Sequence, residues 1–468
     1  MIAMHKTTTP LKSGLIAAAA ALALAGCAVG PDYVKPKLDI PASFKEDGRW
    51  KTAEPQDAMP RGDWWAVFQD ATLSQLMDTL NRQSPTIAQA EAQYREAQAA
   101  LRQAQAGLFP SLSANASKSH GVATPGAGAG ATSGYNLGLS ASWEIDLWGA
   151  VRREVEAGKA KQQASEAQLA AIRLSSQTQL ATAYLQLVVT DMQLANLRQS
   201  EKLLADTLQL TRNQYAAGIV GDDVVASAES QWKTAQAAVV DKRLTRAQLE
   251  HAIAAQLGQA PASFALPPAS QQPHLPQIPA GLPSTLLERR PDVAAAERNM
   301  AAANAQIGIA KAAFFPTLTL GASGGYRGST FADWVTLPNR IWSVGPSLAL
   351  TLFDAGLRSA QTDQAIAGYD ASVANYRQTV LAALQGVEDN LSAQSLLKEE
   401  ADMQRAAVAA AKRAETIAQN QYQAGTVAYL NVLSAQNARI AAENNLWTVI
   451  NRQYTGSVAL IAALGGHW

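Results

Sequence analysis

The sequence predicts a mostly α-helical chain with membrane β-strands, organised as two tandem repeats that each hold two barrel strands and long coiled-coil helices. Three observations predict this fold class. Motifs recur at an offset of 206 or 207 residues, a run of thirteen residues alternates between apolar and polar side chains, and a helical pattern extends for about 68 residues without proline. We give the repeat the most weight, because a long internal period sets the architecture of a chain.

The two repeats are matched by short motifs. Asn213 to Gly218 reads NQYAAG and returns as NQYQAG from Asn420 to Gly425, at an offset of 207 residues. The pair Phe109-Pro110 returns as Phe315-Pro316 at an offset of 206, so about one residue has been inserted over the whole repeat. The predicted domains are, in order, a signal peptide at 1–26, an extended tether at 27–62, repeat one at 63–260, a proline-rich linker at 261–284 and repeat two at 285–468.

The N-terminus carries an export signal. Two lysines precede an uncharged apolar run that is short for a transmembrane helix but typical of a signal peptide. Small residues follow, and Gly26 precedes Cys27, which is the only cysteine of the chain. This pattern predicts cleavage between Gly26 and Cys27 and lipidation of Cys27, which then becomes the first residue. The alternative is an ordinary buried cysteine in a hydrophobic leader.

Two pairs of strands are predicted from alternation with a period of two residues. From Tyr135 to Leu147 every odd position is apolar or small and every even position is polar or glycine. The predicted strands cover about 110–120, 135–147, 316–323 and 341–352. Aromatic residues near the strand ends fit either an interfacial girdle or core packing: Tyr135, Trp143, Trp148, Tyr326, Trp334 and Trp342. An ordinary half-buried sheet on a soluble domain is the alternative for the strands themselves.

Each strand pair is followed by a long helical hairpin. The predicted helices are 150–217, 220–258, 357–424 and 427–464. In the first of them, apolar residues step by three, four and seven positions, which predicts a coiled-coil seam. The seam residues are Leu180, Tyr184, Leu187, Leu194, Leu197, Leu204, Leu208 and Tyr215. Gly218 and Gly425 each end the first helix of a hairpin.

The strands require more than one chain. Strands that face lipid must close into a barrel, because an unpaired backbone group in hydrocarbon costs several kcal/mol. Four strands per chain are too few, since membrane barrels begin at about eight strands. Two chains would supply about eight strands and a filled interior, whereas three would supply about twelve and leave room for a lumen.

The composition argues against several classes of function. Lysine plus arginine equals aspartate plus glutamate at 38 each, so the net charge is zero. The chain therefore lacks the excess of positive charge that is typical of proteins that bind nucleic acid. The histidines are scattered without the spacing of a metal or catalytic motif, which predicts no metal, no cofactor and no enzyme activity. Glu144 and Asp146 resemble an acid pair, but alternation on a strand explains them.

Three stretches resemble the TolC-like outer membrane factor family, in its lipoprotein branch. They are the start of the mature chain from Cys27 to Tyr33, the segment from Trp64 to Leu76, and the segment from Leu282 to Val293. The resemblance covers essentially the whole mature chain.

The resemblance implies a homotrimer with a twelve-stranded barrel in the bacterial outer membrane and a twelve-helix periplasmic tunnel. It implies a passive export duct for small molecules such as drugs or toxic organic compounds, lipid-anchored and working with a periplasmic adaptor protein and an inner-membrane transporter. A protein-secretion duct of the same family is the alternative. An envelope-anchored structural coiled coil is a further alternative, but it has no use for amphipathic strands.

The resemblance also implies a gate at the periplasmic helix turns. The candidate gate residues are Tyr215, Asp222, Asp223, Tyr422, Tyr429, Leu430, Asn431 and Ser434. Leu430 matches a position that is often apolar and constricting, whereas Asn431 and Ser434 stand where relatives often have aspartate. For Asp222 and Asp223 the alternative is a helix N-cap and first-turn acid after Gly221, stabilised by the helix dipole.

Overall fold

The computed structural model describes residues 28–36, 62–122, 131–276, 278 and 290–466. They fall into two compact units. The first comprises the described part of Met1–Lys37 with Gln93–Glu166 and Ala295–Arg377, and the second comprises the described part of Leu38–Ala92 with Ala167–Ala294 and Gln378–Trp468. The predicted cleavage site and Cys27 lie outside the described residues.

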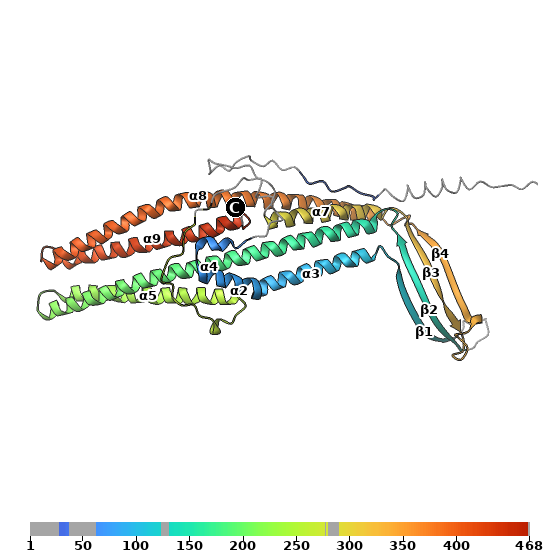
Figure 1. Ribbon diagram of the computed structural model, residues 1–468, viewed down its shortest axis with the longest axis horizontal. Helices are drawn as coiled ribbons and strands as arrows, with labels where there is room; N and C mark the ends of the chain where they lie inside the picture. Colours follow the sequence, from blue (N-terminus) through green and yellow to red (C-terminus); the bar gives the residue numbers. More distant parts are fainter. Residues whose placement is uncertain (1–27, 37–61, 123–130, 277, 279–289, 467–468) are drawn as a thin grey trace, which may run out of the picture. The chain divides into compact units, whose positions relative to one another are not determined.

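The first unit contains a four-stranded antiparallel sheet in the order β1-β2-β3-β4 (Figure 1). The strands are β1 (Ser111–Val122), β2 (Ala131–Ile145), β3 (Thr317–Gly328) and β4 (Arg340–Ala349). Strands β1 and β2 come from repeat one, and strands β3 and β4 come from repeat two. The two repeats therefore meet in the sheet where β2 pairs with β3. The described strands β1 and β4 form its two edges.

The strand register separates an apolar face from a polar face. Leu139 of β2 lies opposite Ala114 of β1 and Gly324 of β3, and Gly324 lies opposite Trp342 of β4. The next row on the other face consists of Ser113, Ser140, Ser323 and Ser343. Two serine pairs in that row lie 2.8 Å apart between their Oγ atoms, Ser113 with Ser140 and Ser323 with Ser343. The alternation with a period of two residues therefore gives the sheet two chemically distinct faces.

Several strand ends differ from the prediction, because pairing rather than alternation decides where a strand stops. β4 ends at Ala349 rather than Leu352, since its partner β3 begins at Thr317, opposite Ala349. β2 ends at Ile145, opposite Leu318, rather than at Leu147, which would lie opposite Pro316, before the start of β3. At the other end of the sheet, β3 continues to Gly328, beyond the predicted end at 323, because β2 offers backbone partners up to Tyr135.

The aromatic side chains gather at both ends of the sheet. At the end that joins the helices, the Trp148 indole donates to the Pro316 carbonyl at 2.8 Å and stacks on Phe315. At the loop end, the Tyr135 ring lies 5.6 Å from Phe331 and 5.9 Å from Trp334. This distribution matches the two interfacial girdles of a membrane protein better than a core.

The helices of the first unit are α7 (Pro291–Ala312), the end of α3 (Pro85–Ala106) and the first turns of α4 (Ala150–Ala216) and α8 (Leu357–Gln423). The residues after the predicted lipidation site form no regular element and lie against these helices. Arg153 of α4 donates to the Val29 and Gly30 carbonyls and to Asp32 at 2.8 Å, and Tyr33 donates to Glu297 at 2.7 Å.

The second unit is built from helices. It contains η1 (Trp64–Phe68), α2 (Ala71–Gln83), most of α4, α5 (Asp222–Gln256), η2 (Pro261–Ser263), most of α8 and α9 (Tyr429–Ala463). Asp70 caps α2 by accepting a hydrogen bond from the Leu73 amide at 2.9 Å, and α3 begins at Pro85, a residue favoured in the first helical position.

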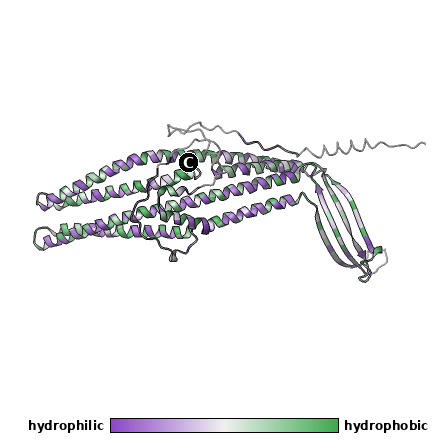
Figure 2. Cartoon of the chain, viewed as in Figure 1, coloured by the Kyte–Doolittle hydropathy of each residue, from purple (hydrophilic) through white to green (hydrophobic). Residues whose placement is uncertain are grey.

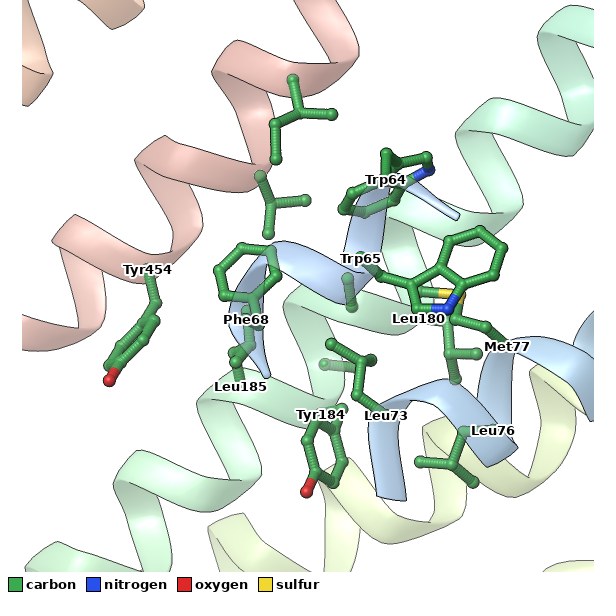
Figure 3. Packing of buried hydrophobic residues seen from close by; sticks show 14 of the residues in the cluster. Trp64, Trp65, Phe68, Leu73, Leu76, Met77, Leu180, Tyr184, Leu185 and Tyr454 are labelled. Atoms are coloured by element: carbon green, nitrogen blue, oxygen red, sulfur yellow. The ribbon is translucent and has the colours of Figure 1, made fainter. Parts of the chain in front are cut away.

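The core of the second unit collects residues from η1, α2, α3, α4, α5, α8 and α9. Phe68, Leu73 and Leu180 are fully buried, and Tyr184 packs beside them while its hydroxyl donates to Asp70 at 2.9 Å (Figure 3). The predicted seam is correct from Leu180 to Leu208, whose residues are buried, but it is wrong for Tyr215, which is 49% exposed. Tyr215 belongs to the last turn of α4, next to the glycine turn.

The proline-rich stretch after η2 packs on the second unit through a buried acid. Asp191 lies between the seam residues Leu187 and Leu194, where the seam lacks an apolar residue, and accepts from Arg246 at 2.6 Å and from the Ala269 amide at 3.0 Å. Arg246 also donates to the Leu266 carbonyl at 2.8 Å. The gap in the seam is thus the attachment point of this stretch.

The helices of the described chain mix polar and apolar residues along their length, as the alternating colours of Figure 2 show. None of these helices combines the length and the apolar character that crossing a membrane requires.

Candidate functional site

The two hairpin turns of the second unit have the same backbone geometry. Gly218 follows α4 and Gly425 follows α8, with φ of 74° and 72°. The Gly218 amide donates to the Tyr215 carbonyl and the Gly425 amide to the Tyr422 carbonyl, both at 2.9 Å. A left-handed residue at this position is favourable only for glycine, so the duplicated motif encodes the turn itself.

The tips of the two hairpins pack on each other. Leu208 of α4, Ala228 of α5, and Tyr429 and Val432 of α9 form a small buried cluster, which we call the tip contact. Beside it, the Tyr422 hydroxyl donates to Gln214 Oε1 at 2.6 Å and joins α8 to α4. At the tips, an apolar contact and a hydrogen bond therefore hold the second hairpin against the first.

Two polar groups in and beside the tip contact have no hydrogen-bond partner among the described residues. They are the Tyr429 hydroxyl and the side-chain amide of Gln436, which is 1% exposed. Burial, with Tyr422 as a second cause, raises the pKa of Tyr429 to about 12, so its phenol is neutral at physiological pH. A buried polar group without a partner costs about 1–3 kcal/mol, which makes this contact weaker than a fully apolar one.

The predicted gate residues divide into two groups. Tyr422 and Tyr429 take part in the contact between the hairpins, and their rings lie 5.5 Å apart. The others are exposed in the chain: Tyr215, Asp222, Asp223, Leu430, Asn431 and Ser434.

Asp222 and Asp223 occupy the first turn of α5, and the N-cap is Gly221, which makes no side-chain hydrogen bond. The N-cap alternative is therefore wrong for both aspartates. The first-turn alternative holds, because negative charge is favourable at a helix N-terminus. A first-turn position leaves both carboxylates exposed, so it is compatible with a place on a channel wall.

An ion cluster lies further from the turns, between α8 and α9, and the sequence reasoning missed it. The Arg439 guanidinium lies 2.6 Å from Glu415 and donates to Glu443 at 2.6 Å, and Lys412 pairs with Glu443 at 3.1 Å. Arg439, Glu415 and Glu443 are each less than 10% exposed. The spacing of Arg439 and Glu443 by four residues is a signal that could have been read from the sequence.

The ion cluster also reaches the first hairpin. Asn196 of α4 donates to Glu443 at 2.9 Å, and Arg439 donates to Ser200 of α4 at 3.3 Å. The cluster is thus a second connection between the hairpins, in addition to the tip contact. Because three of its charges are buried, its geometry is costly to disturb.

The acidic residues at the tips and in the ion cluster are not grouped as metal ligands. Across the described ranges, no group of three or more histidine, cysteine, aspartate or glutamate side chains is placed to hold a metal ion. The interactions at the tips include apolar packing, the Tyr422–Gln214 hydrogen bond and the first-turn carboxylates of α5.

Comparison with known proteins gives a consistent family. The family described as outer membrane efflux protein matches residues 76–259 and 282–466, one segment in each repeat. The chain is 30% identical to the toluene efflux pump outer membrane protein TtgC of Pseudomonas putida over 98% of its own length and 96% of the relative. It is 28% identical to the cation efflux system protein CusC of Escherichia coli, over 96% of this chain and 97% of CusC.

Solved structures agree with the sequence matches. The structure of the outer-membrane channel OprN superposes with a TM-score of 0.86 at 30% identity, covering 94% of this chain and 100% of OprN. The similarity therefore includes both the strands and the helical hairpins.

Proposed function

The chain belongs to the outer membrane efflux protein family and is a protein of the bacterial outer membrane, and from this premise we propose that it forms the passive export duct of a tripartite efflux system. Three copies would form the duct. A periplasmic adaptor and an inner-membrane transporter would supply the cargo and the energy.

One observation carries the proposal, namely a sheet with one apolar face, one polar face and two open edges. The apolar face suits lipid and the polar face suits water, which is the arrangement of a membrane barrel. In hydrocarbon, the backbone N–H and C=O groups at the edges β1 and β4 must pair with other strands. Strands from other copies of the chain would pair with these edges and close the wall of the barrel. Three copies would contribute about twelve strands, enough for an aqueous lumen.

The cargo that we propose is a set of small organic molecules, such as drugs or toxic hydrocarbons. A relative named for toluene efflux and a relative named for cation efflux are both similar to this chain over nearly its full length. Since one fold serves both, the duct contributes little to the choice of cargo. We expect the transporter to make that choice.

The gate that we propose is at the hairpin tips. The tip contact and the Tyr422–Gln214 hydrogen bond hold the second hairpin inward, and three copies would bring Leu430, Asn431 and Ser434 toward the axis. Release of the second hairpin from the first would widen this opening. The adaptor would bind the exposed turns and favour the released state.

Conductance tests the duct directly. Purified trimer in planar bilayers should conduct ions, and Gly345→Lys on the polar face should shift ion selectivity toward anions, because a cation would then line the lumen. Val344→Lys, one residue away on the apolar face, is the matched control and should hinder insertion, since lysine facing lipid at the midplane costs about 2–4 kcal/mol. Failure of the wild-type trimer to conduct would overturn the proposal.

The lipid anchor gives a second test, because Cys27 is proposed to carry the acyl chains. Cys27→Ala should abolish lipidation, measured by mass spectrometry of the mature chain, while the trimer still forms. Because protein side chains, Arg153 and Glu297 among them, bind the segment after Cys27, we expect this segment to stay in place without the lipid. Loss of the trimer in this variant would contradict a purely tethering role.

A further inference from the structure

The loop end of the apolar face carries basic side chains. Lys118 lies opposite Tyr135 on the β1–β2 ladder, and Arg340 lies opposite Tyr326 on the β3–β4 ladder. His120 is on the same face and pairs with the Ser133 hydroxyl at 3.0 Å. We call Lys118, His120 and Arg340 the basic rim. The described residues of this face include no aspartate or glutamate, so the rim has no neutralising partner on its own surface.

Aromatic rings accompany the basic rim. The Lys118 ammonium lies 5.6 Å from the centre of the Tyr135 ring, and Tyr135 contacts Phe331 and Trp334 of the β3–β4 loop. Phe331 is 70% exposed, which is unusual for a phenylalanine unless it meets an apolar phase. Asp333, between Phe331 and Trp334, is the one acid of that loop.

A hollow lies directly below the rim on the same face. Its volume is about 630 Å³, and its lining includes Leu139, Gly324, Tyr326 and Trp342, with Arg340 at its edge. Gly324 provides the depth, because it has no side chain between Leu139 and Trp342 in the same row. We call this hollow the sheet groove. The sheet groove is mostly apolar, and the Arg340 side chain is among the groups that line it.

The position of the rim agrees with the level of lipid headgroups. Along β2, the apolar face extends from Ile145 to Tyr135, which is about ten steps of ~3.4 Å, or ~34 Å. With a strand tilt of about 45°, this length spans ~24 Å, which equals the apolar band of an outer-membrane barrel. The rim therefore lies where the hydrocarbon ends on the side of the loops.

We propose that the basic rim and the sheet groove together bind a phosphate-bearing glycolipid of the outer leaflet. Lys118 and Arg340 contact the phosphates, and one acyl chain lies in the groove over Gly324. The proposal rests on the proposed placement of the sheet in the outer membrane with its loops outward. The ligand is anionic because the face offers only cations, and it is a lipid because the cations stand above an apolar groove.

Native mass spectrometry of the full-length protein in detergent tests the proposal. The probe is lipid A with two phosphates, compared with the same lipid after removal of its phosphates. We expect wild-type protein to retain the phosphorylated form preferentially. Removing a cation near a charged lipid surface weakens binding about fivefold, so the Lys118→Gln/Arg340→Gln variant should lose most of the retention. The charge-preserving Lys118→Arg/Arg340→Lys variant should keep it.

Strand β3 offers matched controls, because Arg327 and Gly321 lie on its polar face whereas Gly324 lies on its apolar face. Arg327→Gln removes a cation on the polar face at the loop end and should leave retention unchanged. Gly324→Leu should reduce retention by filling the groove, because a side chain there meets only the Ile341 carbonyl at 4.0 Å. Gly321→Leu, which faces the other way, should not.

Equal retention by the Lys118→Gln/Arg340→Gln and Arg327→Gln variants would overturn the proposal. Equal retention of the dephosphorylated lipid by wild-type protein would overturn it too. Planar-bilayer conductance of the same preparations shows whether each variant is folded. A wild-type protein that binds the lipid but does not conduct would refute the duct and not the lipid site.

Discussion

Arg439→Met is expected to lower the free energy of unfolding of the helical unit by about 3–5 kcal/mol, the usual cost of breaking a buried ion pair by removing one partner. Glu415 would then be buried without a cation, because Arg439 is its ion-pair partner among the described residues. Glu443 would keep Lys412 and Asn196. The loss should be visible as a lower urea midpoint of the helical circular dichroism signal in detergent.

The matched control for Arg439→Met is Arg452→Met on the same helix. Arg452 pairs with Glu400 of α8 at 3.1 Å, but both side chains are more than 40% exposed. An exposed pair contributes at most about 1 kcal/mol, so this variant should unfold close to wild type. Adding Glu415→Gln to Arg439→Met should recover part of the stability, because it removes the uncompensated charge. Similar midpoints for the two methionine variants would contradict a structural role of the ion cluster.

Tyr429→Ala is expected to open the proposed gate. Truncating a buried aromatic residue costs about 3–5 kcal/mol, and Tyr429 contributes the largest side chain of the tip contact. A loss of about 3 kcal/mol changes the ratio of joined to separated tips about a hundredfold. The conductance of Tyr429→Ala trimers in planar bilayers should therefore exceed that of wild type.

Two conservative variants separate packing from hydrogen bonding at the tips. Tyr429→Phe removes a hydroxyl that has no partner in the described chain, so it should leave conductance low and stability unchanged or slightly higher. Tyr422→Phe removes the bond to Gln214, which is worth about 1 kcal/mol, and should raise conductance less than Tyr429→Ala does. If Tyr429→Phe opens the channel as far as Tyr429→Ala, packing at this residue is not what closes it.

The sequence predicted the elements well where the signal is local. Alternation from Tyr135 onward marked β2, and Gly218 and Gly425 marked both turns, because side-chain alternation and glycine geometry depend only on neighbours in the chain. Strand ends were less accurate, since β4 stops where β3 has no further residue to pair with. Pairing limits are set by the partner strand, and alternation within one strand carries no information about them.

At the candidate site, too, the sequence of one segment does not show which other segment it contacts. Tyr215 and Tyr422 occur in nearly identical motifs, yet Tyr422 bonds Gln214 whereas Tyr215 is half exposed. The ion cluster joins residues from three helices, and a single helical periodicity records only the Arg439–Glu443 spacing. The basic rim and the sheet groove likewise depend on the register of four strands.

By itself, the sequence determined the tandem repeat, the two-faced strands, the long hairpins and the glycine turns, because each follows from the conformational preferences and spacing of adjacent residues. Only the tertiary structure decided which copy of each motif is buried, where the hairpins touch and which charges share a surface. Those properties arise from contacts between segments about two hundred residues apart. The duplication makes such segments nearly identical in sequence, so only their surroundings distinguish them.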